Sequence, residues 1–188
     1  MNLALDLDLN RKYSLEEFCN LSDVCCELVN GMIKLMAGVN KFHVSVSKRI
    51  FRLFDSAFKE PDYFIFYAPF DVIFDESNVY QPDLGLVIDQ SKVKENGIYG
   101  APDLIVEIIS PSSITYDTRH KFDIYEKFKV KEYWIVEPKS EYVKVFKLDN
   151  DKYDEGTLYD YSTDKNVKIK ISFLEDVELS LSDIFKSK

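Results

Sequence analysis

The sequence predicts an α/β fold in which a central mixed β-sheet is flanked by helices and an N-terminal β-hairpin precedes it. Strand-like segments recur along the chain, and an amphipathic helix pattern covers residues 39–58. A second helical segment, at 115–128, separates two strand patterns at 103–110 and 132–138. Because a helix between two strands usually returns the chain by a right-handed crossover, these strands are expected in one sheet with a helix on each side.

The composition is that of one globular domain, expected to span residues 1–188. The chain has 188 residues, of which 46% are hydrophobic and 14% aromatic, which is ample for a sizeable core. A net charge of −9 argues against a broad basic face of the kind that binds nucleic acid. The positive charge is instead concentrated in residues 41–52 and 119–131, either as local basic grooves or as solvated helix faces.

Cysteine usage and the N-terminal sequence predict a soluble, cytoplasmic protein. Cys19, Cys25 and Cys26 form no CxxC motif, so neither a zinc site nor a disulfide framework is indicated. The first ten residues lack a basic region followed by an apolar run. No apolar segment approaches the roughly 18 residues of a membrane span, so no membrane association is expected.

Two local signals define the N-terminal elements. Ser14 followed by Glu17 has the form of a capping box, which predicts a short helix. Asn30 and Gly31 lie between two apolar runs and predict a tight hairpin over residues 24–37.

The rest of the chain alternates between helix and strand patterns. Apolar residues of the segment 39–58, Phe42 among them, recur at helical spacing, and Pro61 ends this helix. Runs rich in β-branched and aromatic residues predict strands at 63–69, 70–75, 83–89, 103–110, 132–138, 141–149 and 167–173. Loops or turns are expected at 75–80, 110–113 and 181–185. Thr115 or Asp117 is expected to cap the helix at 115–128.

Two carboxylates in the predicted sheet are the first candidates for chemistry. Alternation along the strand 103–110 places Glu107 near its C-terminal end, on the face that also carries Asp103. Asp83 opens the strand at 83–89, and Gly85 leaves space on the same face. If the two strands are neighbours, Asp83 and Glu107 can converge on a hard cation. Magnesium (or manganese) suits such a site because it often takes one or two protein carboxylates, and the backbone carbonyl of Ile108 would add a third ligand.

Lys121 supplies a cation for the same region. It lies on the helix after the strand 103–110, four residues before Tyr125, so both side chains share one face. The Tyr125 hydroxyl could hold Lys121 or Glu107. A lysine there can orient an attacking water and offset charge on a phosphate in the transition state. The set favours phosphodiester hydrolysis, although acids at strand starts and lysines on helices are also common in purely structural roles.

Several separated motifs resemble one known family. They are "ELVNGMIKLM", "YQPDLGLVID", "GAPDLIVEIISPSS" and "YDTRHKFDIYEKFKVKEYWIVEP". They run in order from about Cys26 to Pro138 and are similar to the restriction endonuclease family often called Uma-two, a branch of the PD-(D/E)XK nuclease superfamily. The resemblance implies a restriction-endonuclease-like core, dependence on a divalent metal and DNA as the substrate class.

The resemblance also implies roles for individual residues. The family's Pro-Asp aspartate matches Asp83, and its strand glutamate matches Glu107. Its helix lysine matches Lys121, whereas the wider superfamily usually places the lysine two residues after the glutamate, where this chain has Ile109. Whether the displaced lysine reaches the site decides how well the pattern is preserved.

The hairpin departs from the family pattern at two positions. Glu27 matches an acid that would add to the site, but Cys26 replaces the preceding tyrosine and Asn30 replaces an aspartate. The Asn-Gly pair nevertheless keeps the turn chemistry.

Other polar residues are interpreted as structural. Asp103 flanks a strand start, Trp134 belongs to the core, and His43 is a helix histidine without an evident partner, although the family often has a histidine there. The serines of the turn lack a Gly-x-Ser-x-Gly elbow and serve, like Asp117, as turn and cap groups; they are Ser110, Ser112 and Ser113.

Three functions remain open from the sequence. The first is a metal-dependent nuclease that uses Asp83, Glu107 and Lys121. The second is a catalytically silent module that binds nucleic acid or protein on the same fold, and the third is a structural protein. The charge of −9 speaks against the first, and a homodimer that brings two basic segments to one duplex would offset it.

Overall fold

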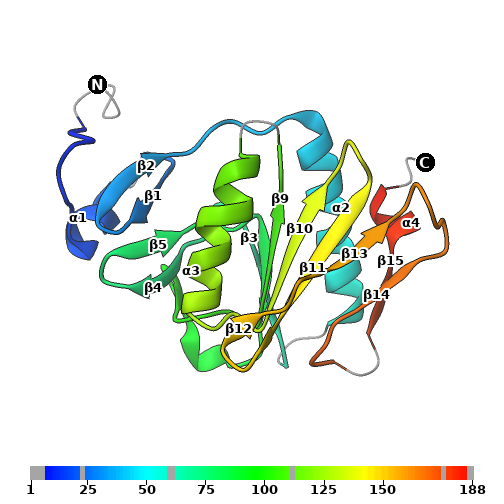
Figure 1. Cartoon of the computed structure of the whole chain (residues 1–188). Helices are drawn as coiled ribbons and strands as arrows, with labels where there is room; N and C mark the ends of the chain where they lie inside the picture. Colours follow the sequence, from blue (N-terminus) through cyan, green and yellow to red (C-terminus); the bar gives the residue numbers. More distant parts are fainter. Residues whose placement is uncertain (1–6, 22–23, 59–61, 111–112, 175–176, 186–188) are drawn as a thin grey trace.

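A computed structural model describes residues 7–21, 24–58, 62–110, 113–174 and 177–185, and its central feature is a mixed β-sheet (Figure 1). The strand order is β12-β11-β10-β9-β6-β3, and β13 pairs with β11. The strands are β3 (Phe64–Tyr67), β6 (Leu84–Val87), β9 (Leu104–Ile108), β10 (Glu132–Glu137), β11 (Tyr142–Asp149), β12 (Lys152–Tyr153) and β13 (Thr157–Asp160). Strands β9 and β10 are parallel and the other pairs are antiparallel, which confirms the predicted mixed sheet.

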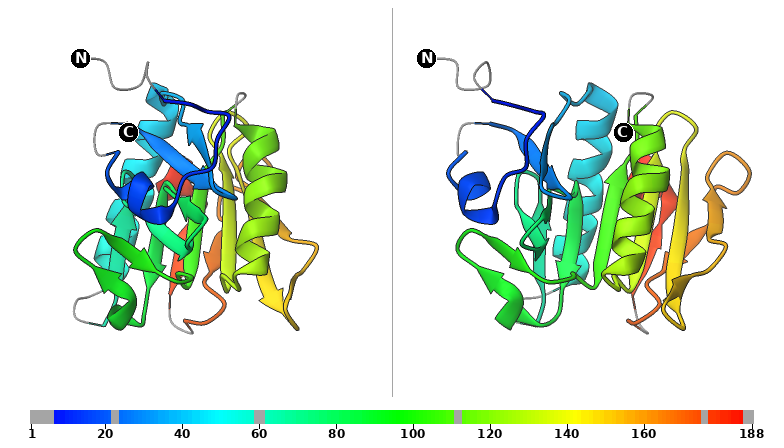
Figure 2. Two further views of the ribbon diagram at one scale, coloured as in Figure 1. Left: turned by 90° about the vertical axis from the view of Figure 1, so that its left-hand side faces the viewer. Right: turned by 60° about the vertical axis from the view of Figure 1, so that its left-hand side comes forward.

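Two helices cover opposite faces of this sheet, as Figure 2 shows from two sides. Helix α2 (Lys41–Ala57) packs on the face that carries Leu104 and Val106. Helix α3 (Phe122–Lys127) packs on the face that carries Ile105 and Ile109. The alternation predicted for the strand 103–110 is therefore confirmed, and it directs Glu107 toward the α3 side.

A second sheet is built from the N-terminal hairpin and the residues that follow β3. Its order is β2-β1-β5-β4-β8-β7. The strands are β1 (Cys26–Val29), β2 (Met32–Leu35), β4 (Val72–Asp75), β5 (Asn78–Tyr80), β7 (Val93–Lys94) and β8 (Gly97–Tyr99). Asn30 and Gly31 adopt φ angles of 51° and 83°, so the predicted Asn-Gly turn is confirmed.

The loop predicted at 75–80 is wrong for its second half, which forms β5. Oδ1 of Asp75 accepts hydrogen bonds from the Ser77 N–H and from the Asn78 side-chain amide, and this tightens the turn to two residues. Strand β5 then pairs with both β4 and β1, and all three of its residues are buried. It joins the hairpin to the rest of the molecule.

The helix predicted at 115–128 begins differently from the expectation. A π-helix, η3 (Tyr116–Lys121), precedes α3. Thr115 stands at the N-cap position without a side-chain cap hydrogen bond, and Asp117 is buried within the helix. Thr115 thus holds the predicted cap position without a capping side chain, and Asp117 is not a cap. Pro111 and Ser112 of the predicted turn lie outside the described residues, as does Pro61, the expected end of α2.

The remaining elements are short. They are α1 (Leu15–Cys19), the 3-10 helix η2 (Gln90–Lys92), β14 (Lys168–Lys170), β15 (Glu178–Ser180) and α4 (Leu181–Phe185). Ser14 and Glu17 form the predicted capping box of α1. Arg49 of α2 donates hydrogen bonds to the backbone oxygens of Ile184 and Phe185, which ties α4 to the α2 side of the sheet. Among the helices described, none has the length and apolar character needed to cross a bilayer.

The prediction that Gly85 leaves open space beside Asp83 is wrong. A Cβ atom at this position would lie 2.3 Å from Cζ of Phe66 and 2.6 Å from the backbone oxygen of Leu104. The absence of a side chain therefore admits the Phe66 ring against β6. Gly85 serves the packing of β3, β6 and β9, and the pairing of β6 with β9 sets the position of Asp83.

Candidate active site

The pairing of β6 with β9 brings Asp83 and Glu107 to one end of the central sheet. The two strands are antiparallel neighbours, with Leu84 opposite Val106. Asp83 immediately precedes this paired stretch, and its Oδ2 accepts a hydrogen bond of 2.7 Å from the Ile108 N–H. The neighbour relationship that the sequence left conditional is thus present.

Glu107 and Lys121 form a buried ion pair. Lys121 Nζ lies 2.7 Å from Glu107 Oε1, and only 3% of each residue is exposed. The Tyr125 hydroxyl donates a hydrogen bond of 2.6 Å to the same oxygen. Lys121 on η3 therefore reaches back to strand β9, and the spacing of four residues to Tyr125 places both donors on one acceptor.

Glu27, on strand β1 of the hairpin, is a second acid that contacts Lys121. Its Oε1 lies 3.1 Å from Lys121 Nζ and accepts a hydrogen bond of 3.2 Å from the Gln81 N–H. Its Oε2 accepts a hydrogen bond of 2.8 Å from the Tyr116 hydroxyl. Only 1% of Glu27 is exposed, and its buried charge is compensated by Lys121 and Tyr116 of η3 and by the backbone N–H of Gln81.

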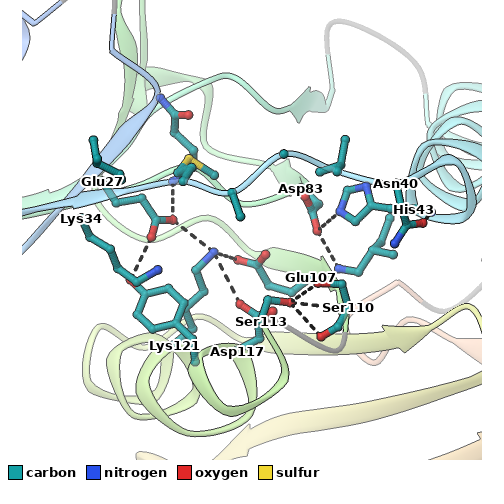
Figure 3. Close-up of a pocket in the computed structure, with 18 residues that line it drawn as sticks. Glu27, Lys34, Asn40, His43, Asp83, Glu107, Ser110, Ser113, Asp117 and Lys121 are labelled. Carbon is teal, nitrogen blue, oxygen red and sulfur yellow. Dashed lines mark hydrogen bonds and ion pairs between the residues drawn. The ribbon is translucent and has the colours of Figure 1, made fainter. Parts of the chain in front are cut away.

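Sequence reasoning missed Asp117 as a member of this group. The residue is buried, and its Oδ1 lies 3.9 Å from Lys121 Nζ (Figure 3). The signal was available, because Asp117 precedes Lys121 by four residues, the same spacing that relates Lys121 to Tyr125. Three carboxylates thus surround one ammonium.

His43 was also assigned no partner, and the structure places it against Asp83. Its Nε2 lies 3.0 Å from Asp83 Oδ2. The residue lies in the first turn of α2, where the Asn40 side chain accepts hydrogen bonds from the backbone N–H groups of Phe42 and His43. This N-cap begins the helix at the cavity and turns the imidazole toward β6. A histidine in an amphipathic helix gives no such signal on its own.

Burial and charge shift the ionisation of the central groups. Burial raises the pKa of Glu107 well above its ordinary value, and the nearby Asp83 and Asp117 add to the rise against the opposing effect of Lys121. Burial alone would lower the pKa of Lys121, but the three carboxylates outweigh it and raise that pKa well above normal. Burial likewise raises the pKa of Asp117. Lys121 is therefore a permanent cation in an acidic cluster.

These residues line a cavity of about 150 Å³ between the hairpin, β6, β9, η3 and the start of α2. Figure 3 shows the side chains of Glu27, Asp117 and Lys121 on one side, Asp83 with His43 on the other, and Glu107 between them. A larger groove of about 730 Å³ adjoins it and shares Asn40, His43 and Ser110 with its lining. The lining of the groove also includes Phe42, which was predicted to lie on the packed face of α2 but is 59% exposed.

The donor atoms fit a hard cation that keeps most of its water. Across the described segments, no hydrogen bond or ion pair reaches Oδ1 of Asp83 or Oε2 of Glu107. Because no fully buried side-chain oxygen in those segments lacks a partner, both atoms retain contact with solvent in the cavity. No set of three or more His, Cys, Asp and Glu side chains among the described residues is arranged as a metal site. Two carboxylates and water are the ligands that magnesium commonly uses.

Several residues singled out in the sequence lie outside the site. Asp103 accepts a hydrogen bond from the Ile88 N–H and pairs with Lys131 at 2.6 Å, consistent with a strand-start role. Trp134 is fully buried in the core, and its Nε1 donates to the buried Glu132. Ser113 Oγ accepts a hydrogen bond from the Ser110 N–H, as expected for a turn group.

Comparisons with known proteins agree with this architecture. The model of the Uma2 family, described as "Putative restriction endonuclease", matches residues 14–182. An uncharacterized protein of Synechocystis, slr1290, is 26% identical over 156 residues, which are 80% of this chain and 81% of that protein. A second uncharacterized Synechocystis protein, sll1609, is 27% identical over 115 residues, 59% of this chain and 65% of that protein.

A solved structure from Anabaena variabilis has a similar fold. It is described as "a putative nuclease belonging to DUF820", and it superposes with a TM-score of 0.74 at 21% identity. The match covers 92% of this chain and 97% of the other. At this level of identity the likeness shows the fold, which is the α/β fold with the restriction-endonuclease-like core that the sequence predicted.

Proposed function

Because this chain belongs to the Uma2 family of restriction-endonuclease-like proteins, we propose that it is a divalent-metal-dependent nuclease that hydrolyses phosphodiester bonds of DNA. The proposal rests on one observation above all. A buried lysine contacts the glutamate of β9, and the aspartate directly before β6 accepts the Ile108 N–H and lines the same cavity. Restriction-endonuclease-like hydrolysis requires this combination of acids and a cation.

Asp83, Glu107 and the backbone oxygen of Ile108 would hold Mg²⁺ or Mn²⁺. When bound, the ion would supply a Lewis acid for the phosphoryl oxygen and favour deprotonation of a water molecule. Lys121 would orient the attacking water and stabilise negative charge that develops on the phosphate. Glu27 and Tyr125 would act as positioning residues, because their contacts hold the lysine and Glu107 in place.

The surface next to the cavity suits an extended substrate. The adjoining groove is lined by three cationic side chains and two acidic ones, in addition to the exposed Phe42; they are Lys41, Arg49, Lys139, Glu137 and Glu141. A polynucleotide has phosphates on both sides of the scissile bond, and basic side chains near the cavity would bind them. The groove supports a polymeric substrate despite the net negative charge of the chain.

Cleavage and metal binding test the proposal through Asp83→Asn. Asparagine is nearly isosteric and can still accept the Ile108 N–H, so the fold should persist, which circular dichroism checks. We expect cleavage of plasmid or oligonucleotide DNA with Mg²⁺ or Mn²⁺, its abolition by EDTA, and a loss of about 100-fold or more in the variant. Isothermal calorimetry should show heat of Mn²⁺ binding in the natural protein and none in the variant.

Asp103→Asn is the matched control for this experiment. Like Asp83, Asp103 stands directly before a strand and accepts a hydrogen bond from a backbone N–H, but it does not line the cavity. It should keep full cleavage. Failure to cut any form of DNA with any divalent metal would sink the proposal, as would equal activity in the Asp83 variant.

The alternative is a module that binds nucleic acid or protein without turnover. It predicts salt-dependent DNA binding, or capture of a protein, that survives in Glu107→Gln without any cleavage by the natural protein. The same cleavage and binding assays therefore separate the two functions.

A further inference from the structure

We propose that Lys34 and the ring of Tyr116 form a phosphate-binding subsite at the hairpin side of the cavity. The inference rests on the proposed function, because the ligand would be a backbone phosphate of the nucleic-acid substrate, next to the bond that is cut. It adds a substrate-binding residue that lies on the hairpin and outside the predicted set of Asp83, Glu107 and Lys121.

The position of Lys34 is held by contacts on the cavity lining. It lies on β2, is half-buried and lines the cavity. Its Nζ lies 3.5 Å from the centre of the Tyr116 ring, a close cation–π contact. The ring itself is held by the hydrogen bond from its hydroxyl to Glu27 and by stacking on His120 at 5.0 Å. Figure 3 shows Lys34 on the same side of the cavity as Glu27.

Lys34 differs from Lys121 in what surrounds its charge. Lys121 is 3% exposed, and three carboxylates lie within 4.0 Å of its Nζ. No carboxylate in the described part of the chain lies within 4.0 Å of Lys34 Nζ, whose contact is with the face of a neutral ring. A cation–π contact leaves the ammonium hydrogens that point away from the ring able to bind an anion.

The charge of the cavity explains why such a residue is needed. Glu27, Asp83, Glu107 and Asp117 all line it, and the single charge of Lys121 offsets only part of their combined negative charge. An entering phosphodiester would meet mostly negative charge, even with a divalent ion between two of the acids. Lys34 lines the hairpin side of the cavity, where its positive charge would attract the phosphate.

DNA binding measured without turnover tests the subsite. A fluorescently labelled oligonucleotide is titrated, over a series of KCl concentrations, with Asp83→Asn protein that carries either Lys34 or Lys34→Met. We expect the dissociation constant at low salt to rise about tenfold in Lys34→Met, as for the loss of one charge-assisted hydrogen bond. The slope of log Kd against log salt should fall by about 0.7 to 0.9, the value for one phosphate contact. Lys34→Arg should restore most of that slope.

Lys165→Met is the matched control. Lys165 Nζ lies 3.9 Å from the centre of the Tyr161 ring, so this variant removes a similar cation–π contact from a residue that lines neither the cavity nor the groove. It should leave both the affinity and the salt slope unchanged. In the active protein, Lys34→Met should raise KM with little change in kcat, because a remote phosphate contact contributes uniform binding.

The outcomes separate this inference from the proposed function. If the natural protein cuts DNA but Lys34→Met binds with the same slope as Lys165→Met, the subsite is wrong and the nuclease stands. If no cleavage occurs but the slope still falls in Lys34→Met, the subsite stands and the nuclease is wrong. Absence of any DNA binding at low salt would overturn the subsite as well.

Discussion

Lys121 and Glu107 lie 14 residues apart in the sequence, and their charged atoms are 2.7 Å apart in a buried site. The pair joins the end of a central strand to a helix that packs on the same face. Glu27 and Asp117 flank the same ammonium. Several buried negative charges are therefore balanced by one positive charge, and the site is sensitive to the loss of that charge.

Lys121→Met should strongly destabilise the fold. Removing the ammonium leaves buried carboxylates without compensation, and the expected loss in the free energy of unfolding is about 3 to 5 kcal/mol. Lys152→Met is the control, because Lys152 also contacts a glutamate at 2.6 Å but its side chain is 78% exposed. That variant should lose little stability, because a solvent-exposed ion pair contributes little to the free energy of unfolding. Urea unfolding compares the two, and equal losses would contradict a tightly buried charge cluster.

Tyr125→Phe should lower the free energy of unfolding more than Tyr153→Phe, which also removes a buried tyrosine hydroxyl. The Tyr125 hydroxyl donates to the carboxylate of Glu107, and a hydrogen bond to a charged group contributes about 1.5 to 3 kcal/mol. In Tyr153→Phe the lost partner is the neutral backbone oxygen of Val130, for which about 0.5 to 1.5 kcal/mol is expected. Thermal and urea unfolding measure the difference. If Tyr153→Phe lost more stability than Tyr125→Phe, the hydrogen bond from Tyr125 to Glu107 would not have the strength expected for a charged acceptor.

Asp117→Asn should change how stability depends on pH. Burial raises the pKa of Asp117 above its ordinary value of 3.8, so the folded protein holds this proton more tightly than the unfolded chain. Its contribution to stability is complete below pH 3.8 and is lost as the pH rises through the folded-state pKa. The free energy of unfolding of the natural protein, relative to Asp117→Asn, should therefore fall between acid and neutral pH.

A series of urea unfolding curves in both proteins measures this difference, since titratable groups that do not interact with Asp117 contribute equally to both. A difference that instead favours the natural protein more as the pH rises would mean that Lys121 stabilises the ionised form of Asp117 more than burial disfavours it.

Gly85→Ala should disturb the strand that positions Asp83. A methyl group there would overlap the Phe66 ring and approach the backbone oxygen of Leu104, which forces either the ring or a strand to move. Overpacking of this kind costs about 1 to 3 kcal/mol or more. At Gly38 an added Cβ meets nothing within 4 Å, so Gly38→Ala should be close to neutral. Melting temperatures report the contrast, and equal melting temperatures would contradict the tight contact.

Local patterns predicted the framework of the site, because the underlying physics is local. Side chains alternate between the two faces of β9, so the face of Glu107 could be predicted without any tertiary information. The turn at Asn30 and Gly31 follows from their tolerance of positive φ angles. The spacing between Lys121 and Tyr125 predicted their shared face, and both donate to Glu107.

The parts that escaped prediction depend on contacts between distant segments. A lone histidine in a helix pattern does not reveal that its imidazole contacts Asp83, forty residues later in the chain. Asp117 has the sequence context of a helix cap, and its burial depends on tertiary packing, which includes the hydrogen bond from the Tyr133 hydroxyl to its backbone oxygen. Short β5 was hidden because its stability comes from β1 and β4 on either side rather than from its three residues.

The π-helical segment η3 restricts how the length of this protein can vary in evolution. A π-helix holds more residues per turn than an α-helix, so η3 can shorten by one residue and leave a regular α-helix. Such a deletion between Asp117 and Lys121 would change their spacing from four to three and break their contact. Lys121 and Tyr116 could then no longer both contact Glu27. Insertions and deletions should therefore be rare in η3 among functional relatives and more frequent in the exposed turn at 162–166.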